Sequence, residues 1–141
     1  MTASLDEHLK RTALFAGFND RQIAGVLAVA NERQFAAGEQ IIRRGEEGGL
    51  GFYLILEGRT EVQAGDAVLA HLGPGDYFGE MALLREDTPR TADVMALEDT
   101  SCLVITQWAF KSLLAAHPDM VLAIMGELAR RLRDTPRTLA E

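Results

Sequence analysis

The chain has 141 residues, 48% of them apolar, which suffices for one hydrophobic core but not for two ordinary domains. Its formal net charge of -7 and its pI near 5 repel phosphate backbones at long range and disfavour nucleic-acid binding. The basic residues Arg130, Arg131 and Arg133 are flanked by Glu127 and Asp134, which break the basic patch, a pattern typical of a solvated helix face. We therefore expect no DNA partner.

Cysteine usage and the first residues indicate the compartment. Cys102 is the only cysteine, which excludes an internal disulfide, and its apolar neighbours Leu103 and Val104 indicate a small buried hydrophobe rather than a nucleophile. The first residues lack the basic start and apolar stretch of a signal peptide, and no segment approaches the length of a membrane-spanning helix. We expect a cytoplasmic protein with no membrane segment.

Residues 1–33 have a helical pattern. Leu5, Leu9 and Ala13 share one face of a first short helix, and after a break Asn19 is placed to cap a second. The apolar residues of the second helix are Ile23, Val26, Leu27 and Ala30. The sequence therefore predicts two short N-terminal helices.

Residues 34–106 change character. Glycines recur there between short runs of strand-forming residues, without helical periodicity. The clearest runs are 52–56, 68–69 and 103–105. Short strands at this spacing predict an antiparallel barrel, roll or sandwich.

Residues 107–134 return to helix. Thr106 is a candidate cap for a short helix in which Trp108 and Phe110 are expected to pack in the core. Pro118 then opens a longer helix that ends before Pro136. The predicted apolar stripe of the longer helix consists of Val121, Ile124, Met125, Leu128 and Leu132. The expected fold is thus a single, mainly β domain with flanking helices over residues 1–141.

The segment 78–92 interrupts the strands with residues suited to an anion. Gly79 lets a ligand approach the backbone, and the residues after it can form a helical turn whose free N–H groups face a phosphate. Arg90, stiffened by Pro89, can give the same phosphate two parallel hydrogen bonds. Glu80 beside an anion needs a donor of its own, such as a ribose hydroxyl. These residue types fit a cyclic ribose phosphate, but Glu80 and Arg90 alone also fit a structural ion pair.

The complete pattern decides between these two interpretations. Phe-Gly-Glu-Met-Ala-Leu-Leu at 78–84, followed by Pro-Arg-Thr-Ala at 89–92, resembles the phosphate-binding cassette of cyclic-nucleotide-binding domains. That family includes the catabolite activator protein, regulatory subunits of protein kinase A and cyclic-nucleotide-gated channels. The resemblance extends over residues 5–133. It implies an antiparallel β-roll, jelly-roll-like, with N-terminal helices, a short cassette helix and C-terminal lid helices.

The resemblance also implies roles for individual residues. Glu80 matches the carboxylate that binds the ribose 2′-hydroxyl, and Arg90 matches the arginine on the cyclic phosphate. Thr91 stands where threonine or serine in the family favours cyclic GMP or accepts both nucleotides, while family frequency favours cyclic AMP. Backbone contacts are implied for Gly79, Ala82 and Thr91, pocket walls for Leu69 and Ala92, and Phe78 and Met81 complete the cassette.

The last helix matches the family's lid, which moves over the base when ligand binds. Arg130 or Arg131 is then placed to stack on or cap the purine, and the alternative is that both are solvated. The same helix is also a candidate for a homodimer contact. The tail 135–141 is too short for a DNA-reading element. We expect a sensor that acts on an effector protein, either as a free-standing protein, which the initiating Met and the tail favour slightly, or as a domain of a channel or enzyme.

Two other classes of function are weaker. A metal-dependent cupin-like enzyme needs clustered histidines, whereas His8, His71 and His117 lie far apart, and no catalytic set or cofactor motif is present. A degenerate domain that serves only as an interaction scaffold would not need an intact Glu80 and Arg90. We therefore predict a regulatory module that is not an enzyme, whose ligand is a cyclic nucleotide and which holds no metal or cofactor.

Overall fold

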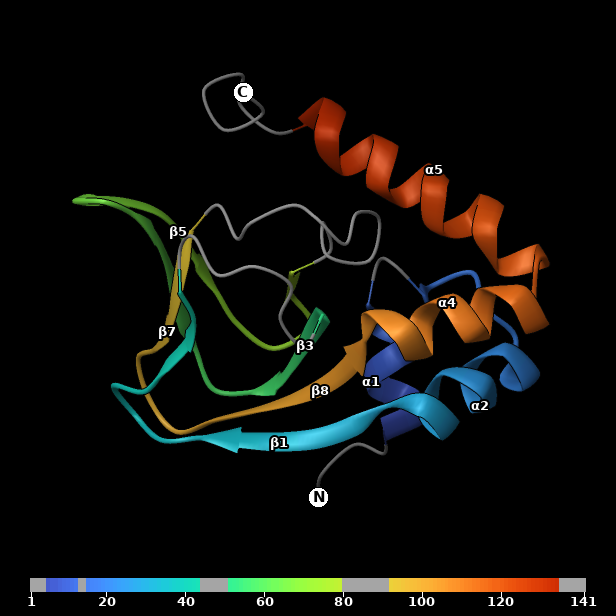
Figure 1. Cartoon of the computed structure of the whole chain (residues 1–141), viewed down its shortest axis with the longest axis horizontal. Coiled ribbons are helices and arrows are strands. Elements are labelled where there is room, and N and C mark those ends of the chain that lie inside the picture. Colours follow the sequence, from blue (N-terminus) through green and yellow to red (C-terminus); the bar gives the residue numbers. More distant parts are fainter. Residues whose placement is uncertain (1–4, 13–14, 44–50, 80–91, 135–141) are drawn as a thin grey trace.

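The computed structural model describes residues 5–12, 15–43, 51–79 and 92–134, with backbone only at 128, 131, 132 and 134. The described chain runs from helices through strands and back to helices (Figure 1). Its elements are α1 (Leu5–Arg11), α2 (Asp20–Val29), β1 (Asn31–Phe35), β2 (Gln40–Ile42), β3 (Gly51–Glu57), β4 (Thr60–Ala64), β5 (Ala67–Leu72), β6 (Tyr77–Phe78), β7 (Asp93–Ala96), β8 (Thr100–Thr106), α4 (Gln107–Ala116) and α5 (Asp119–Asp134).

The strands form two four-stranded antiparallel sheets. The first has the order β1-β8-β3-β6 and the second the order β2-β7-β4-β5. The helices gather at one side of this roll, next to β8, and the β4–β5 hairpin lies at the opposite side (Figure 1). The predicted antiparallel roll with N-terminal and C-terminal helices is confirmed. The predicted cassette helix lies outside the described residues.

Strand β3 shows why the first sheet is the middle layer. Phe52 and Leu54 face a core shared with the helices, whereas Tyr53 and Ile55 face a core shared with the second sheet. All four side chains are buried. Because successive strand residues point to opposite faces, a continuous apolar run is what a strand covered on both sides requires.

The helix starts agree with the expected caps. The Asn19 side chain accepts a hydrogen bond from the Gln22 amide, and the Gln22 side chain accepts one from the Asn19 amide, both at 2.9 Å. Thr106 Oγ1 accepts from the Ala109 amide at 3.1 Å. Each bond pairs a backbone N–H that the first helical turn leaves free. Both predicted caps are confirmed.

Two predictions about C-terminal packing are wrong. Trp108 is 77% exposed, because it lies about 200° around α4 from the buried Phe110 and the two cannot face the same core. Met125 of the predicted stripe is 58% exposed, whereas Ile124 of the same stripe is buried as predicted, together with Met120, which the stripe did not include. The periodicity of α5 is compatible with more than one apolar stripe, and tertiary contact selects the one that packs.

One boundary differs from the expected one. Strand β1 begins at Asn31, inside the segment 1–33 that was assigned to helices, and it pairs along its whole length with β8. Its first four residues are exposed, so they lack the alternating pattern that identifies a strand from sequence.

Among the described helices, none combines the length and the apolar character needed to cross a bilayer.

Candidate functional site

The structure places five of the predicted site residues. Leu69 lies in β5, Phe78 ends β6, Gly79 follows it directly, Ala92 directly precedes β7, and Arg130 lies in α5. The other predicted site residues lie outside the described part of the chain: Glu80, Met81, Ala82, Arg90 and Thr91, together with the side chain of Arg131.

The two ends of the cassette lie on different sheets. Phe78 closes β6, the edge strand of the first sheet, whereas Ala92 precedes β7, which lies between β2 and β4 in the second. Gly79 has φ +82°, a left-handed conformation that glycine adopts without steric cost. The chain therefore leaves β6 through a turn that favours glycine, at the position where the sequence predicts close approach of a ligand to the backbone.

A short turn delivers the chain to β6. The Gly73 amide donates to Asp76 Oδ2 at 2.8 Å, and the Asp76 amide donates to the Gly73 carbonyl at 3.0 Å. The turn is joined to β3, because the Ile55 amide donates to the Asp76 carbonyl and the Ile55 carbonyl accepts from the Gly75 amide, both at 2.9 Å. Residues 72–78 thus form a hydrogen-bonded entry to the cassette.

Leu69 occupies an irregular position in β5. Val62 pairs with Ala70 and Gln63 pairs with Val68, so Leu69 has no direct partner on β4. Such a bulge changes the direction of the side chain it carries. Leu69 is half-buried on the edge strand of the second sheet, which leaves it partly accessible, as a pocket-wall residue must be.

Arg130 is joined to its own helix. Its guanidinium donates to the Glu127 carboxylate, one turn earlier on α5, and its side chain is half-exposed. The start of the helix is also tethered, because Gln22 Nε2 of α2 donates to Asp119 Oδ2 of α5. The described part of α5 is therefore attached to the domain near its beginning, by this bond and by the buried Met120 and Ile124.

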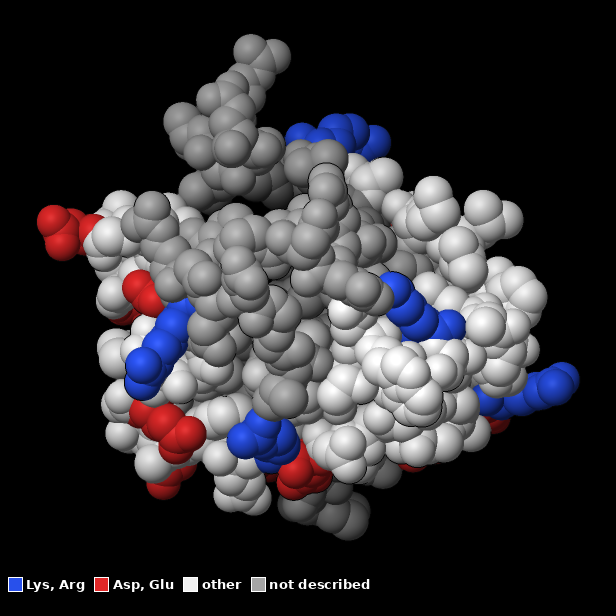
Figure 2. Space-filling view, in the orientation of Figure 1, with Lys and Arg blue, Asp and Glu red and all other residues white. Residues whose placement is uncertain are grey.

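Among the residues that the structure describes, the remaining charged and reactive groups do not gather into a second centre. Acidic and basic side chains are interspersed on the face shown in Figure 2. On the outer face of the second sheet, hydrogen bonds from Gln63 and then His71 lower the pKa of Glu61. Burial raises the pKa of the Cys102 thiol to about 12. Within the described ranges, no three His, Cys, Asp or Glu side chains gather as metal ligands would.

The sequence interpretation missed the residues that hold β6. Tyr53 and Phe78 stack in the core between the sheets, with ring centroids 4.9 Å apart and planes 6° apart. Phe52 and Tyr77 are in contact in the core beneath the helices, with centroids 5.4 Å apart. A signal was present, since two adjacent aromatic residues in each of two strands place one ring on each face of a sheet.

Comparison with known proteins identifies the family. The family model described as Cyclic nucleotide-binding domain matches residues 32–117, more than half of the chain and including the whole cassette. The N-terminal domain of a transcriptional regulator from Streptomyces coelicolor A3(2) has a similar structure, with a TM-score of 0.78 and 30% identity over 89% of this chain and 92% of that one. The chain therefore belongs to the cyclic nucleotide-binding domain family.

Two curated relatives show that this domain occurs in larger proteins. The Cyclic AMP receptor protein of Thermus thermophilus is 33% identical over 131 residues, which cover 89% of this chain and 60% of that protein. Glutaminase 2 of Bradyrhizobium diazoefficiens is 36% identical over 123 residues, covering 86% of this chain and 19% of the enzyme. The chain thus spans only part of the length of each relative, one of which is a receptor by name and the other an enzyme.

Proposed function

We propose that the chain is a sensor module that binds 3′,5′-cyclic AMP. The observation that carries this proposal is the family match over residues 32–117, within which the cassette residues Glu80 and Arg90 are both intact. The name of the Thermus thermophilus relative supports cyclic AMP as the nucleotide. Leu69 at the bulge of β5 and Ala92 at the start of β7 are proposed as pocket walls.

The proposed chemistry is recognition of one negative charge and one sugar hydroxyl. Arg90 binds the cyclic phosphate through two charge-assisted hydrogen bonds, and the backbone N–H groups that follow Gly79 bind it from the other side. Glu80 accepts the ribose 2′-hydroxyl, which gives this carboxylate a donor beside an anion. A phosphodiester carries a single charge, so this set needs no metal ion.

The proposed response is a movement of α5. Its beginning is held by Met120 and Ile124, and the backbone between α4 and α5 is non-helical at His117. A hinge there would let the remainder of the helix, with Arg130 and Arg131, close over the base. Such closure follows from binding only if the nucleotide has higher affinity for the closed state than for the open one.

The proposed role is regulatory and not catalytic. In Glutaminase 2 the matching region occupies 19% of the chain, which supports a module that accompanies an activity located elsewhere. We propose a cytoplasmic setting and an effector protein as the partner that senses α5. The net charge of -7 argues against a DNA partner for this domain. A homodimer through α5 is compatible with the exposure of Leu122 and Met125.

A two-ligand titration tests the assignment of Glu80 and Arg90. Affinities for cyclic AMP and its 2′-deoxy analogue are measured by calorimetry with the native chain, Glu80→Gln and Arg90→Ala. Arg21→Ala on α2 is the matched control for loss of one exposed positive charge. Because Arg90→Ala removes a charge-assisted pair of hydrogen bonds, it is expected to lower the affinity for both ligands by about 30- to 100-fold.

The analogue isolates the role of Glu80. The native chain is expected to prefer cyclic AMP over the 2′-deoxy analogue by about tenfold, and Glu80→Gln is expected to lose most of that preference. If Arg90→Ala binds cyclic AMP as tightly as the native chain does, the cassette assignment is contradicted. Absence of binding by the native chain would favour a fold retained as an interaction scaffold.

A further inference from the structure

The strand that leads into the cassette has little backbone support of its own. Strand β6 consists of Tyr77 and Phe78, and among the described strands it lies at the edge of its sheet and pairs with β3 alone. A strand this short makes few ladder hydrogen bonds, and an edge strand has a neighbour on one side only. Side-chain contacts therefore add to the backbone hydrogen bonds that hold it, which include those of Ile55 with Gly75 and Asp76 just before the strand.

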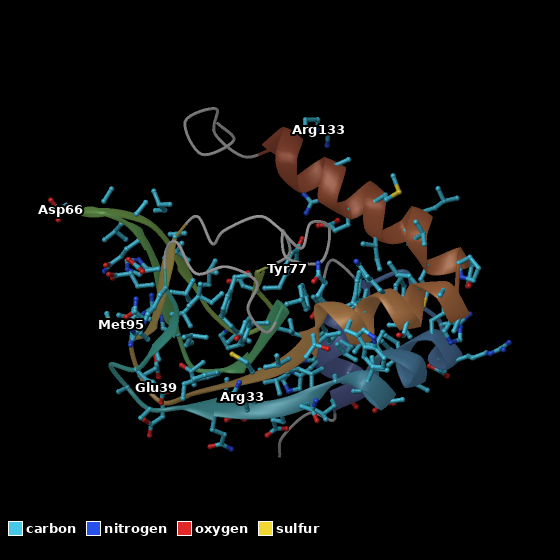
Figure 3. The ribbon with its side chains drawn as sticks, in the orientation of Figure 1. Arg33, Glu39, Asp66, Tyr77, Met95 and Arg133 are labelled. Carbon is cyan, nitrogen blue, oxygen red and sulfur yellow. The ribbon has the colours of Figure 1, made fainter. Side chains whose placement is uncertain are left out.

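Those contacts are made by aromatic rings on both faces of the sheet. On the face toward the second sheet, the buried rings of Tyr53 and Phe78 are almost parallel at 4.9 Å, and the two residues are direct partners in the register. On the face toward the helices, where Tyr77 is labelled in Figure 3, the Phe52 and Tyr77 rings lie 5.4 Å apart. A rotation of β6 about its own axis would break both contacts at once.

We propose that Tyr53 is a positioning residue for the cyclic nucleotide, acting through Phe78 on the backbone of Gly79. Phe78 and Gly79 are consecutive, so the plane of the Phe78 ring and the direction of the Gly79 peptide are linked by a few bonds. This inference rests on the proposed function and adds a residue outside the cassette motif. Because productive hydrogen bonds to a phosphate require accurate donor positions, a small displacement of β6 lowers affinity.

The contribution of Tyr53 to positioning can be separated from its contribution to the core. Phe35 belongs to the same core between the sheets and contacts the same Tyr53 ring, with centroids 6.3 Å apart. It lies on β1, which is separated from β6 by β8 and β3. Phe35→Leu therefore removes a buried ring of this core from a strand that does not pair with β6, and it is the matched control for Tyr53→Leu.

The experiment compares unfolding free energy with affinity for cyclic AMP in four chains: native, Phe35→Leu, Tyr53→Leu and Tyr53→Phe. Both leucine variants are expected to lose stability. Only Tyr53→Leu is expected to bind about tenfold more weakly, as loss of a well-packed aromatic pair predicts. Tyr53→Phe keeps the ring and is expected to bind within about twofold of the native chain.

Each result distinguishes this inference from the proposed function. Equal affinities of folded Tyr53→Leu and Phe35→Leu, or failure of Tyr53→Phe to restore binding, would overturn the inference and leave the sensor function intact. Absence of binding by the native chain would overturn both. If Tyr53→Leu does not fold, Tyr53→Met takes its place, because methionine fills the volume without a planar ring.

A measurement without ligand supports the same distinction. The Ile55 amide donates to the Asp76 carbonyl at 2.9 Å, immediately before β6. The rate of hydrogen exchange at this amide is expected to be about tenfold higher in Tyr53→Leu, or in Tyr53→Met if that variant replaces it, than in Phe35→Leu, because only the Tyr53 variants lose the ring stack. Equal exchange in the two variants would show that β6 does not depend on Tyr53 and would overturn the inference.

Discussion

Arg130 donates two hydrogen bonds to Glu127, from Nε to Oε2 at 3.0 Å and from Nη2 to Oε1 at 2.6 Å. This two-point contact orients the planar guanidinium of Arg130, a group that stacks on flat rings in a way that a lysine ammonium does not. If Arg130 contacts the purine, Arg130→Lys is expected to weaken cyclic AMP binding by about two- to fivefold, the range for stacking at a partly exposed site. Calorimetry measures this difference.

The control for that prediction lies on the same helix. Arg133 is exposed in the last turn of α5 (Figure 3), and Arg133→Lys makes the same replacement at another position of this helix. It is expected to bind like the native chain. Equal affinities of the native chain and Arg130→Lys would contradict a base contact by Arg130.

Gly58 faces β8 with no room for a side chain. It has φ +98°, and a Cβ there would lie 2.4 Å from Thr100 Oγ1 and 2.6 Å from the Asp99 carbonyl oxygen. The combined backbone and steric penalties predict that Gly58→Ala lowers the free energy of unfolding by about 2–4 kcal/mol. Denaturant unfolding followed by circular dichroism measures the change.

Gly126 provides the opposite case. It lies inside α5, it is exposed, and a Cβ there would meet nothing within 4 Å. Gly126→Ala is expected to raise the free energy of unfolding by about 0.5–1 kcal/mol through helix propensity alone. A Gly58→Ala chain as stable as the native one would contradict the described turn between β3 and β4.

The buried thiol of Cys102 predicts a dependence of stability on pH. Burial raises its pKa from 9.0 to about 12, so the folded chain keeps a proton that the unfolded chain loses above pH 9. The thiol contribution to stability is therefore complete below about pH 9 and falls as the pH rises toward 12. Unfolding free energies across this range are expected to decline less steeply in Cys102→Ala than in the native chain.

The same burial predicts low reactivity. At about pH 8 roughly one thiol in ten thousand is ionised, and the thiolate is the reactive form. Aromatic disulfide reagents should therefore label Cys102 at the rate of unfolding, with a burst only in denaturant. Immediate labelling of the folded chain would contradict the burial of this side chain.

Much of the fold could be predicted from sequence because its local signals agree with its tertiary structure. Asn19 and Thr106 cap the helices that they were expected to cap, and the run 52–56 forms a strand buried on both faces. The prediction failed where local pattern does not determine which side of a helix packs. Trp108 and Met125 are as apolar as their buried neighbours, and only tertiary contacts distinguish them.

The contiguous motif is the part of the candidate site that sequence suggests, and its role in binding stays a prediction, since residues 80–91 lie outside the described chain. The residues 78–92 were identified from their own chemistry and family resemblance, and the glycine conformation at position 79 agrees with that assignment. The bulge that isolates Leu69 depends on the register between β4 and β5, which no local pattern specifies. The stack of Tyr53 on Phe78 depends in the same way on pairing of residues 25 positions apart.

The most direct test of the account is a calorimetric titration of the native chain with cyclic AMP, cyclic GMP and 5′-AMP at the same salt concentration. We predict affinity for cyclic AMP in the range of about 1 μM or tighter, or roughly 8 kcal/mol of binding free energy. Cyclic GMP and 5′-AMP should bind more weakly, the latter because its second phosphate charge and open ring do not match the proposed site. If the native chain binds neither cyclic AMP nor cyclic GMP, the sensor function is contradicted.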